Sequence, residues 1–448
     1  MSQQLTIKII MRHACLIIFL AVTSTTHLDS RFFAAEATLE QLKVDLGSSN
    51  AKVRRKAASE LGKTKNREAV QPLLSAATDR DVSVREEVVK SLGLLKDQEA
   101  ITMLLTTIKD PADSVREESI IALVNLYADR DAVWVVTRTA KKVNKTINPF
   151  SDQVGDDATV IEAYVQVAPM VIDSIADRLV DSNLAIRLDA AKALGVLRAR
   201  PATPRMIDAM KTGDTNLRIA VLRSLYKIRD TSVDEQILPY LNDSDKNVRD
   251  ETILALGLFR SKKALPELKR IYDQNPDTKL RLKAFQALAL IGDGSTLDLF
   301  QRNLRDPDKA YRQAAAEGIG RVGDASLVEE VSRTFLTEKD LGAQLAQSFA
   351  LYRLGRKEFI DKLLIGIAER MYYQQPTAYF VEMGALVVPD LVRNLNHQNA
   401  IVRERLCGVL GLIGDSSTIE QLKPLLRDSN SSVASEAALA IRRLGAGS

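Results

Sequence analysis

A phrase that recurs at a nearly constant spacing organises almost the whole chain. In Asp243–Gly257 it reads DSDKNVRDETILALG, with an apolar residue before Arg249 and a leucine seven residues after it. Most successive copies lie 31 residues apart, and one step is 32. The arginine of the phrase recurs at Arg54, Arg85, Arg116, Arg187, Arg218, Arg249, Arg281, Arg312 and Arg403. A period of this length predicts one elongated array of stacked units that share a continuous core.

Each unit has the pattern of a helical hairpin. In the unit from Asp79, apolar residues at steps of three and four from Val84 to Leu95 predict one helix, and Ile101–Ile108 predicts a second. A residue able to cap the first helix lies four before the arginine, except at Ala112: Asn50, Asp81, Asn183, Asp214, Asp245, Asp277, Asp308 and Asn399. Gly292, Gly323 and Gly414 are predicted to end that helix in the left-handed conformation.

The phrases NAKVRRKAASELG, RDVSVREEVVKSLG and QNAIVRERLCGVLG resemble HEAT repeats, in particular the short bacterial form shared with phycobilisome lyases. The resemblance covers about residues 38–446. It implies an all-α, right-handed α-α superhelix, an armadillo-like solenoid of about 13 helical hairpins of about 31 residues each. In that family, recurrent Asp and Arg residues form a polar ladder along the stack. Five aspartates six before the repeat arginines suit this role: Asp79, Asp110, Asp181, Asp243 and Asp306.

Two places break the period. Arg116 to Arg187 spans 71 residues, and the surplus falls in a loop at 144–157 (NKTINPFSDQVGDD). Helices are expected to resume at Thr159–Val167 and Met170–Val180. Arg312 to Arg403 spans 91 residues, which predicts degenerate repeats at 337–398 with Gln344 at the arginine position. The last unit has Ala434 in place of the arginine, as expected where one face of a terminal repeat meets water.

Residues 1–35 do not join the repeat and have the pattern of a signal peptide. Basic residues precede the apolar run Ala14–Val22, which is too short to span a bilayer. We therefore expect export to the periplasm, the cell envelope or the medium, with residues 36–448 as a single solenoid. An uncleaved anchor is the alternative. Cleavage near Ser24 or after Ala35 and a start at Met1 or Met11 all fit.

The charge pattern argues against a nucleic-acid partner. The formal net charge is only +4, and the repeat arginines have acidic residues four or six places before them. Binding to nucleic acid needs a surplus of basic residues on one face. We interpret the arginines as a structural ladder and expect no membrane span in the mature chain.

No catalytic, cofactor or metal site is predicted. Only three histidines occur, His13, His27 and His397, and none is followed by Glu. Deoxyhypusine hydroxylase is a HEAT-repeat metalloenzyme whose iron is held by His-Glu motifs, so that activity is not expected here. Cys407, a nucleophile or bilin-handling thiol in the alternative interpretation, lies where other repeats carry alanine or valine and is predicted to pack in the core.

One local anomaly is a candidate for binding a partner. Four aromatic residues gather around Pro376 in a chain that is only 5% aromatic: Tyr372, Tyr373, Tyr379 and Phe380. Aromatic side chains with a polar tip are favoured at interfaces. The alternative is that they fill space between imperfect repeats. Trp134, before the 144–157 loop, is a weaker candidate of the same kind.

The pattern therefore predicts an exported, non-catalytic scaffold that binds a partner protein or peptide on its solenoid surface. The alternative function, implied by the resemblance, is that of a phycobilisome-lyase-like enzyme or chaperone acting on a tetrapyrrole-bearing protein. A purely architectural protein of the envelope is a third possibility.

Overall fold

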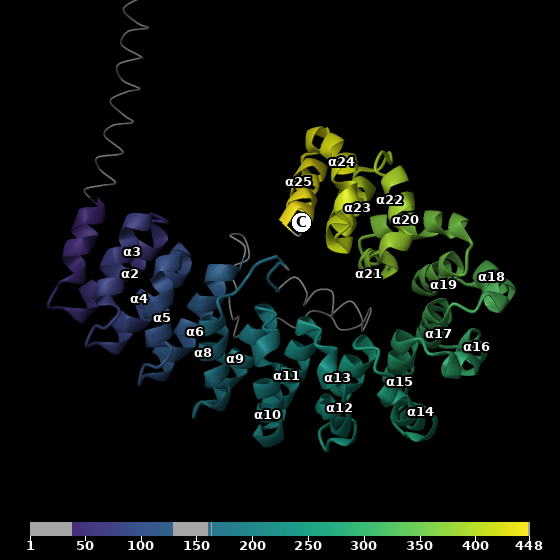
Figure 1. Ribbon diagram of the computed structural model, residues 1–448, viewed down its shortest axis with the longest axis horizontal. Helices are drawn as coiled ribbons and strands as arrows, with labels where there is room; N and C mark the ends of the chain where they lie inside the picture. The colour runs from purple at the N-terminus through teal and green to yellow at the C-terminus, as the bar shows by residue number, and fades with distance from the viewer. Residues whose placement is uncertain (1–37, 129–159, 163, 447–448) are drawn as a thin grey trace, which may run out of the picture. The chain divides into compact units, whose positions relative to one another are not determined.

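A computed structural model describes residues 38–128, 160–162 and 164–446 (Figure 1). All regular elements in these residues are α-helices or 3-10 helices, which confirms the all-α prediction. The chain divides into two compact units, residues 1–127 and 128–448. The expected signal peptide, Trp134 and the 144–157 loop lie outside the described residues.

The first unit stacks helical hairpins. We call the first helix of each hairpin the A helix and the second the B helix; in most hairpins the A helix carries the repeat arginine. The A helices are α2 (Ala51–Lys63), α4 (Val82–Leu95) and α6 (Asp113–Tyr127). The B helices α3 (Val70–Ala76) and α5 (Ile101–Thr107) follow the 3-10 turns η1 (Arg67–Ala69) and η2 (Gln98–Ala100). Because α4 packs between α2 and α6, the core is continuous from one hairpin to the next.

The second unit continues the pattern from α8 (Pro169–Ala176) and η3 (Asp177–Val180). Its A helices are α9 (Leu184–Val196), α11 (Thr215–Ile228), α13 (Lys246–Leu258), α15 (Thr278–Ile291), α17 (Lys309–Val322), α19 (Leu341–Arg353), α21 (Gln374–Met383), α23 (Ala400–Ile413) and α25 (Ser431–Ala446). Its B helices are α10 (Thr203–Thr212), α12 (Asp234–Ile237), α14 (Leu265–Gln274), α16 (Leu297–Asn303), α18 (Val328–Thr337), α20 (Ile360–Ala368), α22 (Val388–Arg393) and α24 (Ile419–Leu422). Short 3-10 turns adjoin the B helices: η4 (Arg200–Ala202), η5 (Thr231–Val233), η6 (Leu238–Asn242), η7 (Lys262–Ala264), η8 (Gly294–Thr296), η9 (Ala325–Leu327), η10 (Lys357–Phe359), η11 (Gly384–Leu386), η12 (Ser416–Thr418) and η13 (Lys423–Arg427).

The two helices predicted after the loop have different outcomes. Met170–Val180 is confirmed, since α8 and η3 cover it. Thr159–Val167 is wrong for the residues that the structure describes there, which form no helix. The N–H of Ile161 instead donates to the carbonyl of Val196 at the end of α9 (2.9 Å). The backbone of Ile161 therefore forms its hydrogen bond with α9, and not with a residue of its own segment as the predicted helix would require.

Both ends of the A helices follow the sequence. All eight predicted N-cap side chains accept a hydrogen bond from a backbone N–H of the first turn. Gly292, Gly323 and Gly414 have φ of 62°, 79° and 81°, which confirms the predicted left-handed ends. Elsewhere basic residues take positive φ at the helix end: Lys65, Lys96, Arg198, Arg229 and Arg260. A cation there interacts favourably with the helix dipole, which offsets part of the strain.

Successive A helices approach closely at a glycine in each of several repeats. A Cβ atom on Gly62 would lie 2.6 Å from the Cβ of Ser91, and one on Gly93 would lie 2.8 Å from that of Ala122. The same contact joins Gly257 to Ala287, Gly320 to Ala350 and Gly411 to Ala440. These distances leave no room for a methyl group, so the backbones of neighbouring A helices pack almost directly against each other. We call these the glycine contacts.

Candidate interaction surface

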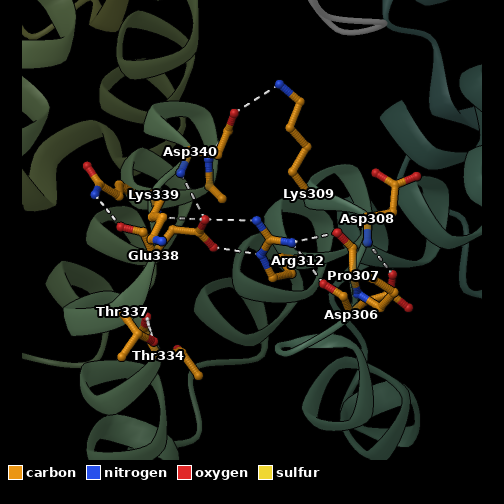
Figure 2. A network of polar contacts seen from close by, with 12 residues as sticks. Asp306, Pro307, Asp308, Lys309, Arg312, Thr334, Thr337, Glu338, Lys339 and Asp340 are labelled. Atoms are coloured by element: carbon orange, nitrogen blue, oxygen red, sulfur yellow. Dashed lines mark hydrogen bonds and ion pairs between the residues drawn. The ribbon is translucent and has the colours of Figure 1, made fainter.

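The repeat arginines lie at the N-terminal ends of the A helices, and Figure 2 shows the bonds of one of them. Arg312 donates from Nε and Nη2 to the carboxylate of Glu338 (2.7 and 2.9 Å). Its Nη1 donates to the carbonyl oxygens of Asp306 and Pro307 in the preceding loop (2.8 and 3.0 Å). One guanidinium therefore ties the start of its own A helix to the loop before the next one.

The same arrangement recurs in both units. Arg54 binds Asp79, Arg85 binds Asp110 and Arg403 binds Asp428, each pair 25 residues apart with nitrogen–oxygen distances of 2.6 to 2.9 Å. Arg218 pairs with Asp243 at 3.2 Å. Glu338 takes the place of aspartate in the degenerate region. There Gln344, at the arginine position, donates to the carbonyl of Glu338 (2.7 Å) as the arginines do.

The other repeat arginines show different bonds within the described residues. Arg187 and Arg249 keep the bond to the loop carbonyl six residues before them, at 2.7 Å each. The position 25 residues ahead holds Thr212 or Gln274, so no carboxylate is available there. Arg281 turns to the carbonyl of Tyr272 (2.7 Å). Arg116 binds the carbonyl of Asp110 and the carboxylate of Asp113. Seven of the nine repeat arginines, all except Arg218 and Arg281, thus donate to the carbonyl oxygen six residues before them, which makes this bond the most frequent part of the pattern.

Ion pairing lowers the pKa of the carboxylates in the ladder. The hydrogen bonds from Arg54, Arg312 and Arg403 hold the pKa values of Asp79, Glu338 and Asp428 below their usual range. For Asp110, burial is the largest influence and opposes the shift, but the bonds from Arg85 and neighbouring groups outweigh it. These arginines use their donors within the fold, so their geometry is that of a structural ladder.

The aromatic group around Pro376 separates into two parts. Tyr379 and Phe380 are 3% and 0% exposed, which agrees with the alternative that they fill space between imperfect repeats. Tyr379 stacks on Phe349 with ring centroids 4.4 Å apart, and its hydroxyl donates to Glu317 (2.5 Å). They fill the space beside α19, against which α21 packs. Packing is the role of these two residues.

Tyr372 and Tyr373 are half-buried in the turn that leads from α20 into α21. Met371, in the same turn, is 63% exposed. The guanidinium carbon of Arg405 lies 4.1 Å from the centre of the Tyr373 ring. Beside the turn lies a groove of about 530 Å³, lined in part by Leu364, Ile365, Ala368, Glu369, His397 and Val402. Ile365 is 56% exposed. We call this the α20 groove. Its lining also includes the polar residues Asp361, Asn394 and Asn399, so both apolar and polar side chains line it.

A charged cluster that the sequence did not predict lies at the other end of the A helices. Glu382, on α21, accepts from Arg260 beyond the end of α13 (2.7 Å) and from Arg321 in the last turn of α17 (3.0 Å). Arg321 also donates to Glu317 (3.3 Å) and is buried, with a side chain 5% exposed. Burial opposes ionisation of Glu382, but the charges of the nearby arginines outweigh it and lower its pKa. No local spacing signals this cluster, since Arg260 and Glu382 are 122 residues apart.

Cys407 and His397, the remaining candidate residues, have surroundings that belong to the fold and not to a reactive site. Cys407 is fully buried, as predicted, and burial is the main cause that raises the pKa of its thiol to about 12. His397 accepts the backbone N–H of Asn399 through Nδ1 (3.1 Å). Residues 38–128, 160–162 and 164–446 hold no group of three or more His, Cys, Asp or Glu placed to bind a metal ion. Over the same residues, no helix has the length and apolar character that a membrane crossing requires.

Comparison with known proteins gives one family. The model for HEAT repeats matches residues 36–124, 235–320 and 388–447, just over half of the chain. Deoxyhypusine hydroxylase of Arabidopsis thaliana is 26% identical over 220 residues, which cover 48% of this chain and 69% of that protein. The bilin biosynthesis protein PecE of Nostoc sp. is 26% identical over 180 residues, covering 40% and 68%. The solved complex of CpcE and CpcF of phycocyanin lyase from Nostoc sp. aligns with a TM-score of 0.25 at 18% identity, covering 70% of this chain and 94% of that one.

Proposed function

Since the chain belongs to the HEAT-repeat family, we propose that it is an exported scaffold that binds a partner protein through the surface of its helical stack. Stacked hairpins bury one side of each helix and leave long exposed surfaces, which is the usual basis of binding by such arrays. The observation that carries the proposal is the α20 groove with the exposed turn beside it. The ladder arginines are engaged within the fold and are not part of the proposed site.

The groove suits an extended segment of a partner with an apolar side chain. Leu364, Ile365 and Ala368 line it with apolar surface, and Met371 adds an exposed apolar side chain in the turn that follows α20. His397 and Glu369 supply polar groups in the same lining. An interface of this kind combines an apolar centre with a polar rim, and aromatic residues such as Tyr372 are favoured in it.

Export is proposed from the sequence of residues 1–35. Fractionation of cells that express the full chain, followed by N-terminal sequencing of the exported protein, tests it. We expect a mature N-terminus between about residue 24 and residue 36. Recovery of the intact chain only from the cytoplasm would contradict export without bearing on the binding site.

The binding site is tested by crosslinking and capture from cell-envelope extracts with purified mature protein. We expect Met371→Ser combined with Ile365→Ser to abolish recovery of a specific partner while helical content by circular dichroism is unchanged. The matched control is Leu336→Ser, which removes a side chain that is 81% exposed on α18. Equal loss in both variants, or retention of the partner by the double variant, would contradict a site at the α20 groove.

A second candidate function is that of a subunit or chaperone acting on a tetrapyrrole-bearing protein. The observation that favours it is the similarity to the bilin biosynthesis protein PecE. Mixing the full chain with free bilins or haem and recording absorption spectra separates the two functions. A saturable spectral shift favours the tetrapyrrole function, and unchanged spectra favour the plain scaffold.

A further inference from the structure

The C-terminal ends of α13, α17 and α19 bring three arginines to Glu382. Arg260 follows α13, Arg321 lies in the last turn of α17, and Arg353 is the last residue of α19. The two carboxylates of this cluster, Glu317 and Glu382, are both engaged. Glu382 accepts from Arg260 and Arg321, and Glu317 accepts from Arg321 and from the hydroxyl of Tyr379. Three positive charges therefore face two negative charges.

Arg353 carries the unbalanced charge. Its Nε donates to the carbonyl of Gly320 (2.7 Å), and its guanidinium carbon lies 5.7 Å from the centre of the Phe349 ring. Among the described residues it forms no ion pair within 4.0 Å. The Nε bond and the ring fix the orientation of the guanidinium plane, while the Nη1 and Nη2 groups have no acceptor in this part of the chain. Those two groups form the end of the fork that binds a carboxylate through two parallel bonds.

The surroundings of Arg353 favour an added anion. Burial is the largest influence on the pKa of Arg353 and lowers it, and the charges of Arg260 and Arg321 act in the same direction while Glu382 opposes them. A cation that has lost part of its water and has cationic neighbours is stabilised by a negative charge beside it. Arg260, with a side chain 53% exposed, keeps the cluster open to solvent.

We propose that Arg353 and Arg260 form a binding site for a carboxylate group, supplied by an acidic segment of a partner protein. Arg353 would bind the carboxylate through Nη1 and Nη2, and Arg260 would share its charge between Glu382 and the ligand. The proposal rests on the proposed function for the source of the ligand. Its residues differ from those of the α20 groove, so an experiment that disproves one site leaves the other untouched.

The test is fluorescence polarisation of a labelled hexaglutamate peptide with the full chain, in parallel with calorimetric titration of free succinate. We expect saturable binding of the peptide that Arg353→Gln weakens about tenfold, the loss expected for one charge-assisted two-point contact. Arg353→Lys should keep part of the affinity, because it keeps the charge but not the fork. The matched control is Arg333→Gln on α18, an exposed arginine that binds only the carbonyl of Glu329 among the described residues.

Several results would overturn the site. Absence of saturable peptide binding would do so, as would equal weakening by Arg353→Gln and Arg333→Gln, which would indicate unspecific attraction. Binding of succinate as tight as that of the peptide would overturn a protein source for the carboxylate. If Arg353→Gln alters the circular dichroism spectrum, Arg260→Gln decides, because its exposed side chain can be replaced without opening the core. Unchanged peptide affinity in Arg260→Gln would then overturn the site.

Discussion

Arg312 and Glu338 bind each other through two hydrogen bonds, from Nε to Oε2 and from Nη2 to Oε1, at 2.7 and 2.9 Å. The side chain of Glu338 is only 3% exposed, and its Oε1 also accepts the N–H of Asp340. The pair therefore joins two successive A helices and the loop between them. It is one member of a ladder whose function is to hold the repeats together.

Replacing Glu338 by glutamine should lower the free energy of unfolding by roughly 1.5–3 kcal/mol, because the bonds to Arg312 lose their ionic character. Urea denaturation followed by circular dichroism measures the change. Glu329→Gln on α18, where the side chain is exposed, is the control and should change stability by less than about 0.5 kcal/mol. Similar losses in the two variants would show that the pair contributes little.

The ladder also predicts that acid destabilises the protein. The folded-state pKa values of Asp79, Glu338 and Asp428 lie below the unfolded values, so the folded state binds fewer protons. Their stabilisation is complete above the unfolded pKa of about 4 and is lost as the pH falls through the folded values. Urea midpoints measured from about pH 7 down to about pH 3 should fall in that window. Glu338→Gln should show a shallower fall, and parallel curves would contradict the assignment.

The basic residues with positive φ predict a gain in stability on substitution by glycine. Lys65 has φ of 53° at the end of an A helix, a conformation that glycine adopts without steric cost. Lys65→Gly should raise the free energy of unfolding by about 0.5–1 kcal/mol, after the loss of the favourable charge at the helix end. The reverse change at the equivalent place, Gly414→Ala, should lower it by about 1 kcal/mol. Thermal unfolding measures both changes in stability. If the two variants were both more stable or both less stable than the parent protein, the argument would be refuted.

The burial of Tyr379 predicts that its hydroxyl stabilises the fold and does not bind a partner. Tyr379→Phe removes the bond to Glu317 in a buried cluster and should cost about 1–3 kcal/mol. Recovery of a partner by affinity capture should be unchanged at temperatures where the variant is folded. Tyr373→Phe, in the half-buried turn, serves as the comparison for stability. A fully stable Tyr379→Phe variant that loses its partner would restore the interface interpretation for this residue.

Much of the fold could be predicted because the determining residues act over short distances in the sequence. Asp308 caps a helix that begins one residue later, and Gly323 ends the same helix. Such contacts repeat at a fixed spacing, so one sequence contains several independent copies of the same signal. The aspartate partner of Arg85 could be expected for the same reason, since the next repeat brings Asp110 to it.

The candidate sites could not be predicted in this way. Glu382 reaches Arg260 because α21 departs from the regular packing, and this contact joins residues four A helices apart along the chain. The aromatic cluster signalled the departure, but composition does not distinguish the buried Tyr379 from the half-buried Tyr373. Which side of α21 faces α19 depends on packing that the repeat does not specify.

The glycine contacts have a consequence for recognition. Helices that meet at a glycine and a small residue such as Ser91 or Ala122 have axes about 8 Å apart, at the short end of helix packing, and no long side chain at that point of contact whose rotamer could alter the spacing. Within each unit, the repeats that carry these contacts are therefore held at a fixed distance from one another. A partner that binds two such repeats meets anchor points at a preset separation, and must match that distance as well as the chemistry of each point.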